Sequence, residues 1–311
     1  MPGLWKNIDR QLRPNQTDSL LEVARTSVSP CEPLYYSRDA KLPYPMKRVA
    51  WLTDIHLNFL AAERIEAFLS EIAGLRADAV LIGGDVAEAP DLEMQLQRIA
   101  ARLAVPVYFV LGNHDYYFGS IRRVREQIES LCRLTPNLVW LPMTGVVELT
   151  STVALVGHDG WADARLGDYE RSLVMMNDYR LIEELAGANK LDRWPLLKAL
   201  GDEAADYFRR VLPLALSKRD HVVALTHVPP FRKACWYQGK ISSDEWLPHF
   251  TCQAVGEALL EVMRDHPRKR LTVLCGHTHS LGETSPLENV IVLTGGAEYG
   301  APHVQRVFEF E

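Results

Sequence analysis

The sequence has few cysteines, and none of them is paired at a spacing typical of a disulfide framework or a metal site. Only five occur among 311 residues, and the sequence contains no C-x-x-C pair: Cys31, Cys132, Cys235, Cys252 and Cys275. An odd, irregularly spaced set predicts free thiols in a reducing compartment. No apolar run is long enough to span a membrane, and the N-terminus lacks the apolar stretch of a signal peptide. We therefore expect a cytoplasmic protein without a membrane partner.

An excess of positive charge is also missing. The 34 Lys and Arg residues are outnumbered by 40 Asp and Glu residues, which gives a net charge of −6. A protein dominated by contacts to a nucleic-acid backbone carries the opposite balance, so a nucleic-acid partner is disfavoured. Two local basic runs, 122–125 and 264–270, are interpreted as a solvated helix face and a turn before a strand. Hydrophobic residues make up 47% of the chain, which is ordinary for a globular protein and argues against disorder of the chain as a whole.

The pattern of apolar residues changes near Arg48. Residues 1–46 contain a turn-rich, proline-containing stretch and are expected to be an N-terminal extension to a domain over 47–311. Short runs rich in Val, Ile and Leu then predict buried strands, at 49–52, 79–82, 107–111, 153–156, 222–225, 271–275 and 290–293. Amphipathic stretches predict helices between the early strands, at 61–73, 91–103 and 120–131.

This alternation predicts an α/β sandwich in which helices cover sheets, and the closely spaced strands towards the end predict a hairpin-rich second sheet. The segment 161–217 interrupts the alternation. It is mostly helical and polar in pattern, so we expect an insertion that caps the active site.

Five short polar motifs follow predicted strands: Asp54-Ile55-His56, Gly83-Gly84-Asp85, Gly112-Asn113-His114-Asp115, Thr226-His227 and Gly276-His277-Thr278-His279. The carboxyl ends of strands are where ligand sites gather in α/β sheets. Glycines before Asp85, Asn113 and His277 are expected to let the backbone turn sharply. Carboxylate, imidazole and amide oxygen suit divalent Mn, Fe or Zn. The donors are too many for one catalytic metal, which usually takes three protein ligands, and they fit two metals roughly 3.5–4 Å apart.

The ordered set strongly resembles the calcineurin-like metallophosphoesterase family, whose motifs run D-x-H, G-D, G-N-H-[DE], H and G-H-x-H. The match spans residues 54–279. The resemblance implies a four-layer α-β-β-α sandwich of two mixed sheets flanked by helices. It also implies seven metal ligands in two groups joined by a bridging carboxylate: Asp54, His56 and His279 for one metal, Asn113, His227 and His277 for the other, and Asp85 between them.

Two bound dications would lower the pKa of a bridging water and give a hydroxide for in-line attack on phosphorus. In the family, the histidine at the position of His114 protonates the leaving-group oxygen or stabilises the transition state. Such a histidine gains from a carboxylate that keeps its ring oriented and cationic. Glu88 stands where related phosphatases place that carboxylate, and Asp115 is the alternative.

Three further residues are candidate substrate contacts. His158, with Asp159, ends a strand on what we expect to be the same rim as the metal ligands. Arg165 is a candidate because a guanidinium clamps phosphate well, and Tyr117 lies close to His114 in sequence.

Departures from the motifs of individual subfamilies narrow the range of expected substrates. Phosphoprotein phosphatases carry G-D-x-x-D-R-G and G-N-H-E, whereas this chain has G-D-V-A-E-A-P and G-N-H-D. Purple acid phosphatases place a tyrosine where Glu88 stands, and the UDP-sugar pyrophosphatases of lipid A synthesis usually replace the histidine at position 114. G-N-H-D is most similar to the phosphodiesterase-type members. We therefore expect a phosphodiesterase or broad phosphomonoesterase for a small or nucleotide-like substrate. A Ser/Thr phosphoprotein phosphatase, a metal-dependent nuclease and a non-catalytic scaffold remain alternatives.

Overall fold

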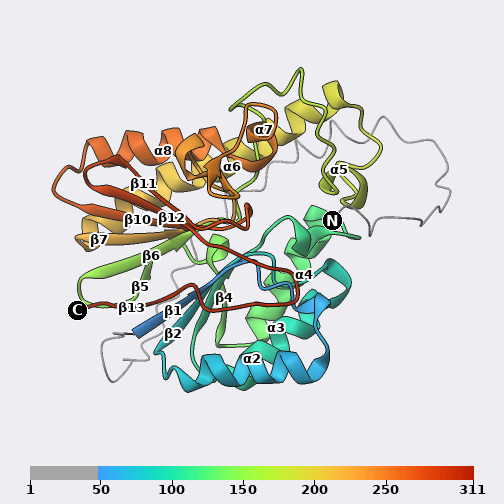
Figure 1. Ribbon diagram of the computed structural model, residues 1–311. Helices are drawn as coiled ribbons and strands as arrows, with labels where there is room; N and C mark the ends of the chain where they lie inside the picture. The colour runs from blue at the N-terminus through green and yellow to red at the C-terminus, as the bar shows by residue number, and fades with distance from the viewer. Residues whose placement is uncertain (1–47) are drawn as a thin grey trace. The chain divides into compact units, whose positions relative to one another are not determined.

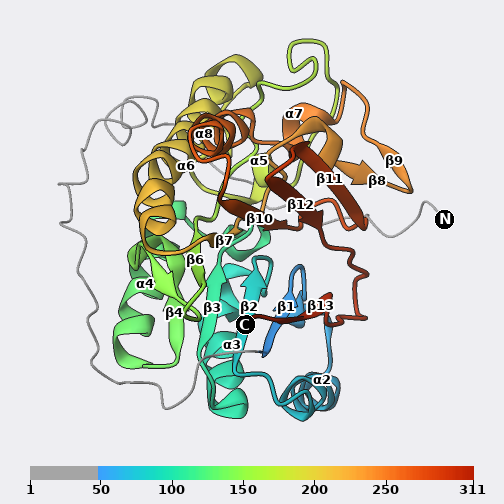
Figure 2. The ribbon, with the colours of Figure 1, turned by 90° about the vertical axis from the view of Figure 1, so that its left-hand side faces the viewer.

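The computed structural model describes residues 48–311 (Figures 1 and 2). The predicted extension over 1–46 lies outside the described residues. The strands are β1 (Arg48–Leu52), β2 (Ala79–Gly83), β3 (Val107–Val110), β4 (Leu138–Trp140), β5 (Val147–Glu148), β6 (Val153–Gly157), β7 (His221–Leu225), β8 (Trp236–Tyr237), β9 (Lys240–Ile241), β10 (Arg270–Cys275), β11 (Gly282–Leu287), β12 (Val290–Thr294) and β13 (Arg306–Glu309). The α-helices are α2 (Ala62–Gly74), α3 (Ala89–Leu103), α4 (Ile121–Leu134), α5 (Asp178–Leu181), α6 (Lys190–Lys218), α7 (Leu247–Phe250) and α8 (Gln253–Arg264).

The strands form two large sheets. The first has the order β13-β1-β2-β3-β4, and the second has the order β11-β12-β10-β7-β6-β5. Strands β1 to β4 pair in parallel, as do β6, β7, β10 and β12, whereas the edge strands β13, β5 and β11 are antiparallel to their neighbours. All seven predicted buried strands and all three predicted helices are confirmed within a few residues at their ends.

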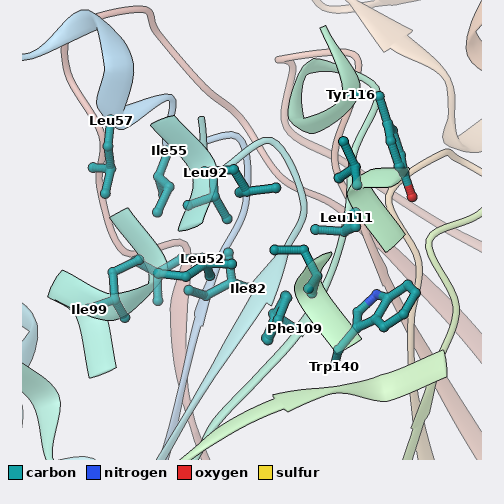
Figure 3. Packing of buried hydrophobic residues seen from close by; sticks show 14 of the residues in the cluster. Leu52, Ile55, Leu57, Ile82, Leu92, Ile99, Phe109, Leu111, Tyr116 and Trp140 are labelled. Carbon is teal, nitrogen blue, oxygen red and sulfur yellow. The ribbon is translucent and has the colours of Figure 1, made fainter. Parts of the chain in front are cut away.

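Alternate residues of the first sheet face opposite layers, as the period of two in a strand requires. In β1, Ala50 and Leu52 pack with α2, α3 and α4 in one buried cluster, which Figure 3 shows from close by. Val49 and Trp51 instead pack against the second sheet. Residues of α3 that recur every three or four positions are buried in the first cluster, such as Leu92, Leu96 and Ile99. Figure 3 shows Leu92 and Ile99 in this cluster.

The second sheet repeats this arrangement. Its outer face carries Ala154, Val222 and Val273, which pack with residues of α6 and α8. Figure 1 shows α6 and α8 above the second sheet and α2 and α3 below the first. The order of layers is therefore helix, sheet, sheet, helix, and the predicted four-layer sandwich is confirmed.

The segment 161–217 differs in part from the expected helical cap. Residues 158–177 contain no helix or strand, α5 has only four residues, and α6 is a single helix of 29 residues. The second half of α6 buries Phe208, Leu212 and Leu216 against β6, β7 and α8. This half therefore belongs to the outer helical layer, and only about 161–200 stands outside the sandwich.

The described part of the chain contains some of the features from which the compartment was predicted. Its four cysteines, Cys132, Cys235, Cys252 and Cys275, are free thiols, as predicted. No helix within residues 48–311 has the length and apolarity needed to cross a bilayer.

Candidate metal centre

The five polar motifs lie where the two sheets meet at their carboxyl-terminal edges. Beyond β1 and β2 the parallel hydrogen bonding continues, since the backbone N–H of Asp54 donates to Gly84 O at 3.0 Å. Two contacts then join the sheets: the N–H of His277 donates to Asp54 Oδ1 at 3.0 Å, and His227 Nδ1 lies 2.8 Å from Gly83 O. The structure thus brings all five motifs to one place, as the strand-end argument predicts.

Five of the seven candidate ligands have a left-handed backbone, with positive φ at Asp54 (52°), His56 (42°), Asp85 (54°), His277 (69°) and His279 (55°). Such a conformation costs a non-glycine residue on the order of 1–3 kcal/mol. It persists only where the surrounding structure enforces it, and it gathers at functional sites. The clustering of strain on these residues therefore supports a functional role.

The glycines of the motifs are needed for two different reasons. Gly84 has φ of 94°, so the predicted sharp turn is present there. Gly112 does not have a positive φ; instead a Cβ at this position would lie 2.1 Å from Asp85 Oδ1. Likewise a Cβ on Gly276 would lie 2.0 Å from Asp54 Oδ2. These two glycines allow a carboxylate to approach the backbone closely.

Four candidate ligands form one group. Asp54, His56, Asp85 and His279 each offer a ligand atom, and these atoms lie within 4.8 Å of one another. His56 Nε2 is 3.2 Å from His279 Nε2 and 3.7 Å from Asp85 Oδ2, and His279 Nε2 is 3.4 Å from Asp54 Oδ1. Two imidazole nitrogens this close to each other and to carboxylates require a proton or a metal cation between them.

The other three candidates surround the opposite side of Asp85. His227 Nε2 lies 3.4 Å from Asp85 Oδ1 and 3.1 Å from Asn113 Oδ1. The rings of His227 and His277 are 5.0 Å apart between centroids. Asp85 therefore contacts both groups through different oxygens, which suits the bridging position that the resemblance implies.

The second nitrogen of two of these imidazoles is already engaged. His227 Nδ1 donates to Gly83 O, which leaves Nε2 as the ligand atom. His277 Nε2 lies 3.1 Å from the backbone oxygen of His249 and donates to it, which leaves Nδ1 as the ligand atom. Metal-bound histidines commonly donate their other ring N–H to a carbonyl, which fixes the tautomer and the ring orientation.

The electrostatics suit cations. Burial would raise the pKa of Asp85, but the imidazoles of His227 and His114 outweigh it and hold the pKa well below its ordinary value. Burial lowers the pKa of His56 to about 3, and burial together with His227 lowers that of His277 to about 4. Burial would lower the pKa of His227, but Asp85 outweighs it and raises that pKa to about 10, and Asp54 likewise raises the pKa of His279. These two imidazoles therefore favour protons, which a bound cation would displace. Buried carboxylate, imidazole and amide donors suit divalent metals.

His114 lies beside this cluster. Its backbone N–H donates to Asp85 Oδ1 at 2.9 Å, and its ring lies 4.6 Å from that of His56 and 4.2 Å from that of Tyr117. Ring atom Nε2 is 3.4 Å from the hydroxyl of Tyr299, whereas Nδ1 is buried without a hydrogen-bond partner. The ring is thus held close to the candidate ligands without being one of them.

The two carboxylates considered as partners of His114 occupy different environments. Glu88 is the N-cap residue of α3, and burial raises its pKa while the nearby His114 opposes that shift. Asp115 is fully buried and accepts four backbone N–H bonds, from Asp85, Val86, Ala87 and Gly112. Asp115 therefore fixes the backbone of two motifs, whereas the pKa of Glu88 is influenced by the His114 imidazole.

The predicted substrate contacts have other partners. The guanidinium of Arg165 donates hydrogen bonds to Asp163 and to both carboxylate oxygens of Asp202. These N–H groups are therefore not available to bind phosphate in this arrangement.

His158 is 5% exposed and packs on Tyr207, with its Nε2 near Glu203. The carboxylate of Asp159 accepts from Leu111 N, Trp140 Nε1 and the Tyr116 hydroxyl. His158 and Asp159, which follow β6, thus contact both the first sheet and α6. Arg165 and His158 both have protein partners, which argues against contact with substrate, and their assignment as substrate contacts stays a prediction.

Tyr117 is buried as well, and its hydroxyl donates to Asp178 Oδ1 at 2.7 Å. Asn113 Nδ2 donates to the same carboxylate oxygen at 2.9 Å and to the Tyr117 hydroxyl at 3.0 Å. Tyr117 therefore contacts a candidate metal ligand, and its assignment as a substrate contact stays a prediction. Asp178 was not predicted by any sequence pattern, because it belongs to no motif and lies in the irregular segment.

Tyr299 is a second residue that the sequence did not indicate. It is 51% exposed, and its ring lies 4.7 Å from that of His56 and 5.0 Å from that of His279. Phe59, which is 49% exposed, packs edge-on against it. A cavity of about 440 Å³ adjoins this side of the centre and is lined by Gly239, His279, Ser280, Leu281, Gly296, Ala297, Glu298, Ala301 and His303.

Comparison with known proteins agrees with this picture. The chain is similar to a phosphopantetheinyl hydrolase from Mycobacterium tuberculosis (14% identity, TM-score 0.58, covering 81% of this chain and 90% of that chain). It is also similar to a dimetal phosphatase from Danio rerio (17% identity, TM-score 0.54, covering 86% and 94%). At these identities the likeness shows the fold alone. No curated protein sequence matches the chain. A family model described as calcineurin-like phosphoesterase matches residues 47–281, most of the chain, and the chain therefore belongs to the calcineurin-like phosphoesterase family.

Proposed function

We propose that this chain is a two-metal phosphoester hydrolase acting on a phosphodiester or phosphomonoester of small or nucleotide-like structure. One observation carries the proposal: seven donor side chains from five strand ends converge, and the second polar atoms of His227, His277 and Asn113 are engaged elsewhere. Asp54, His56 and His279 would hold one metal, and Asn113, His227 and His277 the other, with Asp85 shared. Bound metals would lower the pKa of water and neutralise charge on the phosphoryl oxygens.

His114 is the residue proposed to deliver a proton to the leaving-group oxygen. Its ring is fixed between His56 and Tyr117, and its Nε2 faces Tyr299 on the open side of the centre. A general acid must lie within hydrogen-bond reach of the atom that it protonates, and this position satisfies that requirement for a group leaving toward Tyr299. Glu88 is proposed as the carboxylate partner of His114, because its own pKa is influenced by that imidazole.

The surroundings support a small substrate. The cavity of about 440 Å³ beside His279 has room for a leaving group of modest size. Among the described residues that line it, none is Lys or Arg, whereas a nuclease needs basic side chains along the backbone of its substrate. The exposed rings of Tyr299 and Phe59 offer a surface for a planar group.

The test is hydrolysis of bis-p-nitrophenyl phosphate and p-nitrophenyl phosphate by chelator-stripped protein, with and without added Mn²⁺. Activity that returns with Mn²⁺ is expected, and the ratio of diester to monoester rates chooses between the two substrate classes. Asp85→Asn is the matched control, because it keeps the shape of the side chain and removes the shared charge. Two bound metals without activity on either ester would favour the scaffold alternative. Activity on phosphopeptides or single-stranded DNA alone would favour the other two alternatives.

A further inference from the structure

The amide of Asn113 can serve a metal only through its oxygen, so its NH₂ group has to be held in the opposite direction. A carboxylate accepts hydrogen bonds and cannot donate them when ionised. Asn113 Nδ2 donates to Asp178 Oδ1, and the Tyr117 hydroxyl donates to the same oxygen while accepting from Asn113. Only one of the two amide orientations satisfies this network, and it turns Asn113 Oδ1 toward His227.

Asp178 is 4% exposed, and it reaches Asn113 from α5, which is far away in the sequence. The backbone holds α5 in place. Phe118 N donates to Leu181 O at 2.8 Å, and Glu183 N donates to Gly119 O at 3.0 Å. The carboxylate of Glu184 then accepts from the Ser120 hydroxyl and from Ile121 N at the start of α4. The loop after Asn113 and the segment after α5 are therefore joined along several residues, as their proximity in Figure 1 suggests.

The next residue of α5 reaches a second candidate ligand through one intermediate. The hydroxyl of Tyr179 lies 2.6 Å from His249 Nδ1, and His249 Nε2 lies 2.9 Å from the hydroxyl of Ser172. Because that hydroxyl donates to Glu245 O, the Nε2 of His249 donates to it, and Nδ1 accepts from Tyr179. The backbone oxygen of His249 in turn accepts from His277 Nε2.

From these contacts we infer that α5 is a buttress for one of the two metal sites, the one formed by Asn113, His227 and His277. Consecutive residues of one short helix fix two of its ligands, Asp178 through the amide of Asn113 and Tyr179 through the backbone of His249. Within residues 48–311, no hydrogen bond runs from α5 to the ligands of the other site. The inference rests on the proposed metal assignment and gives this part of the expected cap a positioning role in place of substrate selection.

The experiment is titration of chelator-stripped protein with Mn²⁺, read by bound metal and by electron paramagnetic resonance, which separates a single Mn²⁺ from a coupled pair. Asp178→Ala removes the acceptor for Asn113. It is expected to bind one Mn²⁺ as the wild type does and the second about 10–100-fold more weakly, the usual effect of losing a ligand's supporting partner. Tyr179→Phe, which removes one hydroxyl, is expected to weaken the same site to a smaller degree.

Two controls separate positioning from charge and from general damage. Asp178→Asn keeps an acceptor oxygen for Asn113 and is expected to retain the second metal. Glu170→Ala removes an exposed carboxylate of the same segment and is expected to bind as the wild type does. Thermal unfolding in the presence of chelator reports whether each variant folds. If Asp178→Ala does not fold, Tyr179→Phe still tests the inference.

Five outcomes of the titration are informative. Selective loss of the second metal in Asp178→Ala and Tyr179→Phe supports the buttress. Wild-type affinity at both sites in these two variants overturns it, and so does equal weakening of both sites. An equal loss in Asp178→Asn and Asp178→Ala overturns the argument from amide orientation. Failure of the wild type to bind two Mn²⁺ would instead refute the proposed function, so the two failures are distinguishable.

Discussion

Asp115→Asn is expected to destabilise the protein strongly although the substitution changes one atom. Each oxygen of the Asp115 carboxylate accepts two backbone N–H bonds: Oδ1 from Val86 and Ala87 at 2.8 and 3.0 Å, and Oδ2 from Asp85 and Gly112 at 2.9 and 2.8 Å. An asparagine has one carbonyl oxygen and one NH₂ group. In either orientation its NH₂ group therefore faces two N–H donors.

The magnitude follows from those two donors. A buried donor left without an acceptor costs about 1–3 kcal/mol, so two of them predict a loss of about 2–6 kcal/mol in the free energy of unfolding. Burial and the nearby Asp85 carboxylate raise the pKa of Asp115 to about 8, although the N–H groups of Ala87 and Gly112 oppose the shift. We nevertheless expect the ionised form, because each oxygen already accepts two N–H bonds and a proton on it would displace one of these donors. A neutral carboxyl would predict almost no cost for the substitution.

Urea unfolding in the presence of chelator measures this loss without a contribution from metal binding. Asp265→Asn, at an exposed position after α8, is the matched control and is expected to change little. An unfolding free energy of Asp115→Asn within about 0.5 kcal/mol of the wild type, the range of ordinary surface substitutions, would refute the reasoning. If the same variant also shifted the pH profile of hydrolysis, Asp115 and not Glu88 would be the partner of His114.

Three other substitutions test the assignments. Asp85→Asn is expected to abolish hydrolysis and to weaken both Mn²⁺ sites, measured by metal titration, since the shared carboxylate contacts both groups; loss of one site only would show that it is not shared. His114→Ala is expected to lower turnover by about 10²–10⁴-fold, the usual contribution of a general acid, with two metals still bound; loss of both metals would mean that the residue is a ligand. Arg165→Met is expected to leave KM for bis-p-nitrophenyl phosphate unchanged because the guanidinium is paired with Asp163 and Asp202; a several-fold rise in KM at unchanged kcat would restore it as a substrate contact.

The sandwich and the convergence of the motifs were predictable because both depend on local patterns. Buried strands are recognised in a sequence as short runs of Val, Ile and Leu. Parallel strands of one sheet have their carboxyl ends at the same edge of that sheet. Once Asp54, Asp85 and Asn113 follow neighbouring strands, their meeting requires no knowledge of side-chain contacts. The same logic brings His227 and His277 together from the second sheet.

The substrate contacts were not predictable in this way. His158 follows a strand as the metal ligands do, but its ring turns toward Tyr207 on α6 instead of toward the centre. Arg165 has the chemistry of a phosphate clamp, and its partners Asp163 and Asp202 are equally suited to a guanidinium. The residue type determines which groups a side chain is able to bind. Which of these groups it does bind depends on the partner that the fold places nearest to it.

The same limit explains why α5 could not be recognised from the sequence. A metal ligand is specified by its own donor atom, and that atom is visible in a motif. The orientation of the ligand is specified by the partner of its other atom, and this partner comes from whatever segment packs behind it. For Asn113 and His277 those segments are α5 and the backbone at His249, neither of which has a strand end or a glycine turn to mark it. The segment 161–200, which contains α5, is therefore the place to look for residues that support the ligands and belong to no motif.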